Sequence, residues 1–266
     1  MQKLSVALCT FNGAEFLSKQ LESIKQQTSP IHELVVCDDG SSDETLAIIE
    51  RFSKQVAFSV HVHRNPVNLG SSKNFEQCMG LCQGDILFLC DQDDVWYADK
   101  LQRAVNWHAK QNPFQKVRLY CGRTQLVDER LLHIGLSPNI KRPPSFGNAL
   151  VQNIASGNTM VFSHSVLMAQ KQVNPAHSVW HDWTTYIVAT ALGGLVCFDE
   201  KPCLLYRQHA SNVIGSNNGF RAQFDRLKPL LEGRFIKWTN SNIEAISDLG
   251  ASTTDTAKST CNQLIK

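Results

Sequence analysis

Residues 87–94 read Leu-Phe-Leu-Cys-Asp-Gln-Asp-Asp, an apolar run that ends in three carboxylates. A short apolar run bounded by polar residues is typical of a strand buried on both faces of a sheet. The three carboxylates repel one another unless a positive group lies among them. A divalent cation with oxygen ligands would supply that charge and would also bind a diphosphate. Alternatively, Asp94 or Asp99 only caps the following helix. The motif alone does not decide between these interpretations.

The chain around this motif alternates short apolar runs with amphipathic stretches. Expected strands cover 4–10, 33–37, 56–63, 85–90 and 117–121, and the stretches between them, including 98–111, have helical spacing. This order predicts an α/β fold, a Rossmann-like and mostly parallel sheet flanked by helices. Ser41 and Glu44 have the spacing of a capping box for the second helix. The polar stretch from Ser252 onward is expected to be frayed.

Polar and ionisable side chains follow three of the expected strands directly. They are Thr10 with Asn12, Asp38 with Asp39, and the acidic motif at 91–94. Ligands of open α/β sheets bind outside the carboxyl ends of the strands, so we expect these three strand ends to meet at one crevice. In the segment 68–74, Gly70 allows a close backbone approach and Lys73 supplies a positive charge.

Composition excludes several classes of protein. The 266 residues are 42% hydrophobic and carry a formal net charge of +2, which argues against disorder and against nucleic acid as a partner. The nine cysteines contain no CxxC pair, so buried reduced thiols are expected. The longest apolar run, 187–198, is interrupted by Gly193-Gly194 and is shorter than the roughly 20 residues of a membrane span. These features predict a cytoplasmic protein.

Four motifs taken in order are more specific than any one of them. They are Thr10-Phe11-Asn12-Gly13, residues 36–43 (VCDDGSSD), Asn68-Leu69-Gly70, and Asp91-Gln92-Asp93-Asp94. Together this series closely resembles glycosyltransferase family 2. The resemblance implies the GT-A fold and transfer of a sugar from a nucleotide diphosphate donor. It divides the chain into a nucleotide-sugar-binding half (1–122), an acceptor-binding and catalytic half (123–215), and a C-terminal helical segment and tail (216–266).

The same resemblance assigns roles by motif position. Thr10, Asn12 and Asp39 would contact the nucleoside, with Asp38 beside them, and Gly70 and Lys73 complete the expected nucleotide site. Asp91 and Asp93 would form the D-x-D element, with Asp91 toward the ribose or the sugar and Asp93 on a Mg²⁺ or Mn²⁺ ion. Family members invert the anomeric configuration and use a carboxylate base.

The second half is similar to the bacterial rhamnosyltransferase branch of the family. Residues 91–96 (DQDDVW), 153–159 and 206–215 carry this likeness. It implies dTDP-rhamnose as donor, a saccharide acceptor of a cell-surface polysaccharide, and Asp182 as the base. It also places His209 near the diphosphate, as a metal ligand or as a partner of the leaving group. A UDP-hexose donor is the alternative within the family.

Other interpretations stay open at this point. Asp182 is also a possible first-turn acid that only stabilises its helix, and a non-catalytic nucleotide-sugar-binding protein would keep the same pocket. A sugar nucleotidyltransferase is disfavoured because basic residues do not follow the first strand. The aromatic residues Trp180, Trp183 and Tyr206 favour a core position over sugar packing. The segment 220–238 either packs on the catalytic domain or rests on the inner face of a membrane that carries a lipid-linked acceptor.

Overall fold

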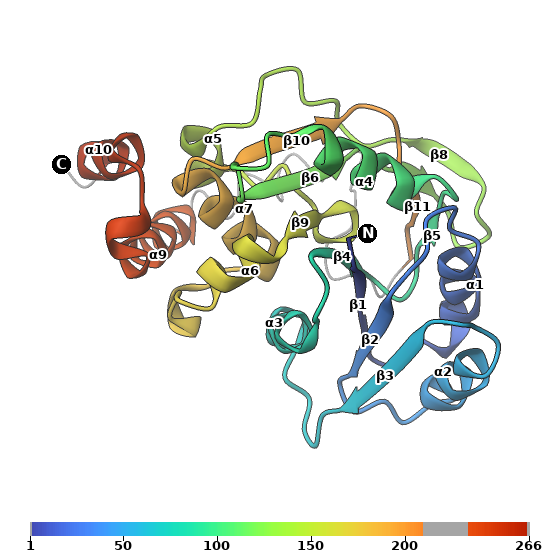
Figure 1. The fold of residues 1–266 in the computed structure, drawn as a ribbon. Coiled ribbons are helices and arrows are strands. Elements are labelled where there is room, and N and C mark those ends of the chain that lie inside the picture. Colours follow the sequence, from blue (N-terminus) through green and yellow to red (C-terminus); the bar gives the residue numbers. More distant parts are fainter. Residues whose placement is uncertain (1, 210–233, 265–266) are drawn as a thin grey trace.

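A computed structural model describes residues 2–209 and 234–264, and its largest element is a seven-stranded sheet (Figure 1). The strand order is β10-β6-β9-β4-β1-β2-β3. The strands are β1 (Leu4–Thr10), β2 (Glu33–Asp38), β3 (Ser59–Arg64), β4 (Ile86–Cys90), β6 (Arg118–Gly122), β9 (Val161–Ser163) and β10 (Leu195–Asp199). All neighbours pair in parallel except β9, which runs antiparallel to β4 and β6. The predicted α/β fold with a mostly parallel sheet is confirmed.

Helices cover both faces of this sheet, because the side chains of each central strand point alternately to two cores. In β1, Val6 and Leu8 lie in one core and Ala7 and Cys9 in the other. The first core is closed by α1 (Ala14–Lys25), α2 (Thr45–Ser53) and α4 (Lys100–Lys110). The second is closed by α3 (Ser71–Leu81), α6 (His164–Gln170) and α7 (His181–Ala191). In Figure 1 α2 and α3 stand on opposite sides of β2 and β3.

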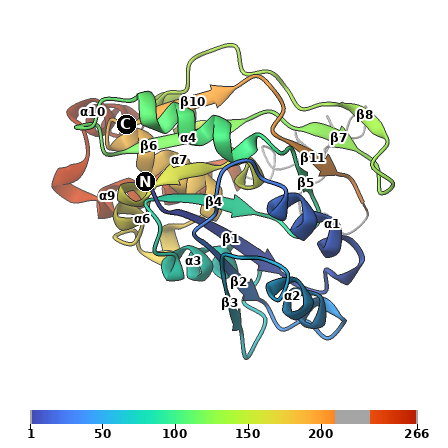
Figure 2. The ribbon, with the colours of Figure 1, turned by 45° about the vertical axis from the view of Figure 1, so that its right-hand side comes forward.

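A second sheet of four short strands was not predicted. Its order is β5-β11-β7-β8, and its strands are β5 (Val95–Trp96), β7 (Gln125–Val127), β8 (His133–Leu136) and β11 (Leu204–Arg207). The strands are two to four residues long, too short to show a periodicity in the sequence. The sheet pairs β11 with β5, directly after the acidic motif, although more than 100 residues separate these strands (Figure 2).

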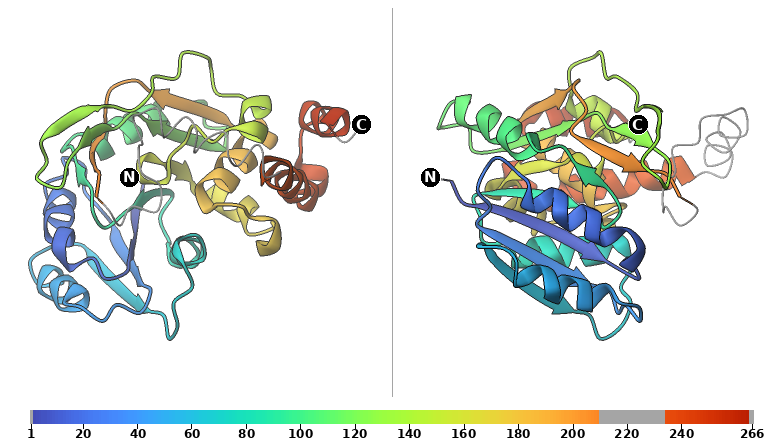
Figure 3. Two further views of the ribbon diagram at one scale, coloured as in Figure 1. Left: turned by 180° about the vertical axis from the view of Figure 1, so that it is seen from behind. Right: turned by 90° about the vertical axis from the view of Figure 1, so that its right-hand side faces the viewer.

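The C-terminal helices pack on the second half of the chain. Helix α5 (Phe146–Val151) lies against α7 and α9 (Arg234–Asp248), and α10 (Asp255–Leu264) follows (Figure 3). Short 3₁₀ turns occur at Gly157–Thr159, Pro175–His177 and Gly250–Ser252. The expectation of a frayed end after Ser252 is wrong for the described residues: Ala257 and Cys261 are buried there. The prediction for 220–238 lies mostly outside the described residues.

The capping box expected at the second helix is also wrong. Helix α2 begins at Thr45, and Glu44 at its N-cap makes no side-chain capping bond. The Ser41 hydroxyl donates instead to the buried carboxylate of Asp38, at 2.5 Å. The amide of Thr45, the first residue of the helix, donates to the Asp43 carboxylate at 3.0 Å, so Asp43 takes the capping role that was expected of Ser41.

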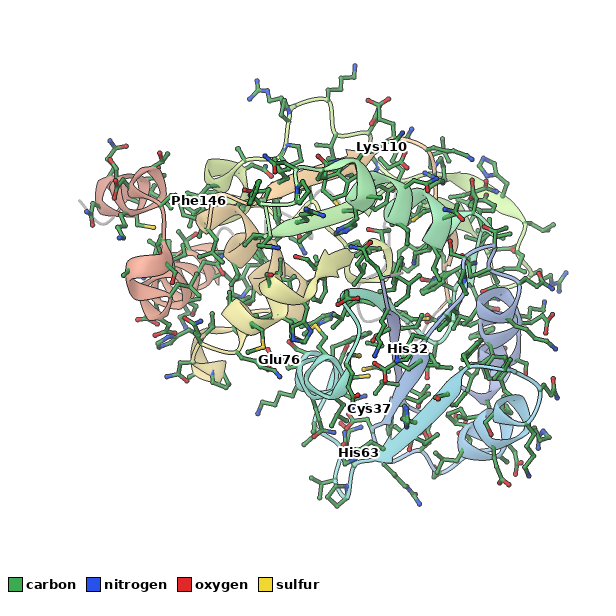
Figure 4. The ribbon with its side chains drawn as sticks, in the orientation of Figure 1. His32, Cys37, His63, Glu76, Lys110 and Phe146 are labelled. Atoms are coloured by element: carbon green, nitrogen blue, oxygen red, sulfur yellow. The ribbon has the colours of Figure 1, made fainter. Side chains whose placement is uncertain are left out.

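The sheet has strands from both sides of residue 122, since β9 and β10 join β1–β4 and β6. The division at residues 122 and 215 therefore stays a prediction about function. All nine cysteines are free thiols, eight of them buried, as expected. Cys37 lies on the α3 side of the sheet (Figure 4). Within the described ranges, every helix is too short or too polar to cross a membrane.

The antiparallel strand β9 makes the core sensitive to truncation. Phe162 is fully buried there between β4 and β6. We expect Phe162→Ala to lower the free energy of unfolding by about 3–5 kcal/mol, since transfer free energy is lost and a cavity remains. Urea denaturation measures this loss. Phe114→Ala is the matched control, because Phe114 is 89% exposed and its truncation should change stability by less than about 0.5 kcal/mol. Equal losses in the two variants would contradict the assigned packing.

Candidate functional site

Hydrogen bonds tie three strand ends together at one edge of the sheet. The Thr10 hydroxyl at the end of β1 donates to Asp38 at the end of β2, at 2.9 Å, and the Asp39 amide donates to the Thr10 carbonyl at 2.8 Å. On the other side of β1, Gln92 bonds both backbone groups of Phe11, at 2.9 and 3.0 Å. The chain order reverses here, since β2 and β4 flank β1. This is the position at which open α/β sheets bind their ligands.

Asp38 shapes the turn after β2. Its carboxylate is fully buried and accepts hydrogen bonds from the hydroxyls of Thr10 and Ser41 and from the Ser41 amide. Asn12 is exposed next to this turn and has φ +46°, a left-handed conformation that asparagine tolerates. Its side-chain oxygen accepts from the Ser42 amide at 2.9 Å. The buried carboxylate thus holds Thr10 and the segment around Asn12 in one place.

Asp39 draws the loop before α3 toward the end of β2. Its carboxylate accepts from the amides of Leu69 and Gly70, at 2.8 and 2.9 Å, and from the Asn65 side chain at 2.8 Å. Gly70 has φ +81°, a conformation that a residue with a Cβ adopts only with strain. Lys73 is exposed in the first turn of α3. The expected nucleotide-binding residues after β2 and before α3 therefore lie at one end of the sheet.

The acidic motif after β4 meets a histidine from a distant part of the chain. His209 Nε2 lies 2.7 Å from Asp93 Oδ2, and the His209 ring packs on Phe16 at 4.8 Å between ring centroids. Asp91 lies deeper. Burial and the charges of Asp93 and Asp182 raise the pKa of Asp91 to about 7. The charges of Asp93 and Asp182 therefore both act on Asp91, and His209 lies against Asp93.

The third acid of the motif points inward. Asp94 is fully buried and accepts from the Asn158 side chain at 2.8 Å and from the Arg207 amide at 3.3 Å. Arg207 in turn donates to the Asp93 carbonyl and lies over the Phe16 ring, 4.6 Å from its centroid. Sequence reasoning assigned no role to Asn158 or Arg207. Both lie in segments that carry the rhamnosyltransferase likeness, but nothing in their spacing shows that they bond to the motif.

Asp182 lies in the first turn of α7. One carboxylate oxygen accepts from the Trp183 amide at 2.7 Å, and the other accepts from the Gly157 amide at 3.1 Å. The two backbone amides therefore fix the orientation of this carboxylate at the start of α7. Trp183 itself is 6% exposed and donates to the Ala149 carbonyl, which confirms the core interpretation for this aromatic residue.

Within residues 2–209 and 234–264, no three Asp, Glu, His or Cys side chains are placed to hold a metal ion by themselves. The donor chemistry nevertheless fits a cation that is shared with a ligand. Asp93 and His209 offer one carboxylate and one imidazole, 2.7 Å apart, and the charge of Asp93 adds to burial in raising the pKa of Asp91 beside them. Diphosphate oxygens and water can complete such a site.

The chain has clear relatives. Residues 5–174 match the profile described as "Glycosyl transferase family 2". The dTDP-rhamnosyl transferase RfbG of Shigella flexneri is 29% identical over 258 residues, which cover 91% of this chain and 85% of the relative. An uncharacterized glycosyltransferase of Nostoc sp. is 32% identical over 226 residues, covering 79% and 66%.

Solved structures show the same fold at low identity. The crystal structure of residues 1–349 of Staphylococcus aureus TarS superimposes with a TM-score of 0.67 at 16% identity, over 97% of this chain and 69% of that one. The mannosyltransferase PcManGT of Pyrobaculum calidifontis, solved with GDP-Man and Mn²⁺, gives 0.61 at 17% identity, over 99% and 79%. The GT-A architecture expected from the motifs is confirmed.

Proposed function

The chain belongs to glycosyltransferase family 2, and from this premise we propose that it transfers L-rhamnose from dTDP-rhamnose to a hydroxyl of a saccharide acceptor, with inversion at the anomeric carbon. The similarity to a dTDP-rhamnosyl transferase over 91% of the chain carries the choice of donor. Asp91, Asp93, Asp182 and His209 support the reaction, because their charges and contacts meet at one end of the sheet. The proposal places the protein in the cytoplasm, in the synthesis of a cell-surface polysaccharide.

In this proposal the nucleotide lies across the ends of β1 and β2. Thr10, Asn12 and Asp39 contact the nucleoside as their motif positions imply. Asn12 is exposed there, whereas Thr10, Asp38 and Asp39 are buried behind it. The Gly70 segment and Lys73 lie beside the phosphates, where the backbone approach and the positive charge favour an anion. Asp91 accepts a hydrogen bond from a hydroxyl of the ribose or the sugar.

The chemical step needs a proton acceptor on the side of the sugar away from the diphosphate. Asp182 takes the proton of the acceptor hydroxyl while its oxygen bonds to the anomeric carbon. The bond from that carbon to the phosphate oxygen breaks, and dTDP leaves with the electron pair. One displacement of this kind inverts the configuration. The amides of Gly157 and Trp183 hold the Asp182 carboxylate in one orientation, which favours the reactive geometry.

The leaving diphosphate gains negative charge in this step. Asp93 and His209 are the residues that would hold Mg²⁺ or Mn²⁺, and the ion would stabilise that charge as a Lewis acid. The Mn²⁺ found with the related fold of PcManGT supports this assignment. A lipid-linked acceptor and contact with the membrane stay predictions from the sequence.

Donor choice can be tested by thermal stabilisation. With MgCl₂ present and ligand at about 100 times Kd, we expect dTDP-rhamnose to raise the Tm by roughly 5–10 °C, because a ligand that binds only the folded state stabilises it. UDP-glucose and UDP-N-acetylglucosamine should give smaller shifts, and release of dTDP on addition of an acceptor tests turnover. A larger shift with a UDP-hexose would replace the proposed donor. Binding without dTDP release, for every acceptor tried, would favour a non-catalytic binding protein.

A further inference from the structure

Lys100 is a buried cation close to the site but outside its proposed ligands. The residue is 1% exposed, and its ammonium lies 3.6 Å from the centroid of the Trp96 ring. It donates to the backbone carbonyl of Asn158 at 2.6 Å, and among the described residues it forms no ion pair. A buried charge destabilises a protein unless it makes strong compensating contacts. The hydrogen bond to the Asn158 carbonyl is therefore a contact that compensates the buried ammonium of Lys100.

That contact lies at the middle of a short turn that joins two parts of the site. In the 3₁₀ turn Gly157–Thr159, the Asn158 side chain donates to Asp94 at 2.8 Å. The preceding amide, of Gly157, donates to Asp182 Oδ2 at 3.1 Å. One buried turn thus connects Lys100 and the acidic motif on one side with the carboxylate of α7 on the other.

The turn has little room to move against α7. A Cβ atom placed on Gly157 would lie 3.0 Å from His181 Nε2 and 3.7 Å from Asp182 Oδ2. The His181 ring is itself fixed, stacked on Phe75 at 4.3 Å between centroids. A shift of the turn would therefore change the hydrogen bond between Gly157 and Asp182 directly.

We propose that Lys100 is a positioning residue for sugar transfer: by holding the Asn158 carbonyl it places the Gly157 amide that orients the Asp182 carboxylate. This inference rests on the proposed role of Asp182 as the base. It predicts a larger effect on the chemical step than on nucleotide binding, because the hydrogen bond of Lys100 goes to the turn beside Asp182 and not to Thr10, Asn12 or Asp39.

Lys100→Met tests the proposal, since methionine keeps the length of the side chain but cannot donate a hydrogen bond. We expect kcat to fall by about 10- to 100-fold, because a small misplacement of a catalytic group has effects of this size. The donor KM should change by less than about threefold. The readouts are steady-state kinetics and the Tm of each variant.

Arg118→Met is the matched control. Arg118 is also a buried cation that donates to backbone carbonyls, those of His108, Asn112 and Gln115. It lies at the start of β6, the opposite edge of the sheet from the site. We expect Arg118→Met to lower the Tm and to leave kcat near that of the parent. A kcat for Lys100→Met within about threefold of the control would overturn the proposal.

Gly157 allows a second test that does not touch the buried cation. A Cβ on residue 157 would lie 3.0 Å from His181 Nε2, so Gly157→Ala pushes the turn away from α7 while it keeps the amide donor. We expect Gly157→Ala to lower kcat by about tenfold, because the amide that orients Asp182 moves with the turn. Gly147→Ala is the matched control, since nothing lies within 4 Å of a Cβ at that position.

The double variant Lys100→Met with Gly157→Ala tests whether the two residues act together through Asp182 or independently. If both residues act through Asp182, the kcat of the double variant should lie within about threefold of the kcat of the less active single variant. A fold loss in kcat equal to the product of the two single losses would overturn the proposal. An active Asp182→Asn enzyme would overturn the proposed base and this inference together. An inactive Asp182→Asn enzyme with an unchanged Lys100→Met enzyme would overturn the inference alone.

Discussion

Replacing Asp182 with Asn is expected to lower kcat by about 10²–10⁴-fold at saturating donor and acceptor, because the acceptor hydroxyl then loses its general base. The amide keeps the shape of the side chain and its place in the first turn of α7. Donor binding should persist, so the thermal shift with dTDP-rhamnose should match that of the parent. Turnover measured by dTDP release gives kcat directly.

The control for this variant is Asp255→Asn. Asp255 is also a first-turn acid, on α10, and it is exposed. Both variants lose a favourable interaction with a helix N-terminus, which is typically 0.3–1 kcal/mol. Only Asp182→Asn should lose turnover. Activity of Asp182→Asn within a few-fold of the parent would leave Asp182 as a helix-stabilising residue and would remove the proposed base.

Removal of the metal ligand Asp93 is expected to have the second large effect. Asp93→Asn should lower kcat/KM by at least about 100-fold, since a Lewis acid at the leaving group contributes several kcal/mol. Chelation of the parent should abolish transfer, and added Mn²⁺ or Mg²⁺ should restore it. In His209→Ala, half-maximal activity should require a higher metal concentration, because one of two protein ligands is lost.

A second histidine–aspartate pair provides the control. His177 Nδ1 lies 2.8 Å from Asp248, close to the 2.7 Å of the proposed metal pair, but this pair joins the 3₁₀ turn Pro175–His177 to α9. His177→Ala should therefore leave the metal dependence unchanged. Full activity in the presence of chelator would exclude the proposed ion, and an equal change in metal requirement for both histidine variants would exclude a specific role for His209.

The strands and helices of the first half could be predicted to within a few residues. Strands β1, β2 and β4 are buried on both faces, so each appears as an apolar run, and the helices between the strands show apolar residues at helical spacing. The exposed strand β3 begins at Ser59, three residues later than predicted. The predicted strand at 85–90 is β4 (Ile86–Cys90), and the predicted helix at 98–111 is α4 (Lys100–Lys110). The meeting of the strand ends also followed from the sequence, because parallel neighbours end at the same edge of a sheet.

The orientation of the motif acids could not be predicted. Asp91, Asp93 and Asp94 look alike in the sequence, yet Asp93 bonds to His209 while Asp94 points inward to Asn158. Which carboxylate is buried depends on the donors around it, and those donors come from β11 and from a turn after residue 150. A single sequence carries no signal of such pairing.

The sequence by itself determined the mostly parallel α/β sheet, the family and the strand ends that meet at one edge of the sheet. These rest on local periodicity and on ordered motifs, which are properties of neighbouring residues. Only the tertiary structure decided how Asp93 meets His209, 116 residues away, and how Lys100 reaches the turn beside Asp182. Such contacts depend on the short strands β5 and β11 and on one buried turn, whose places are set by packing across the whole molecule and not by the residues within them.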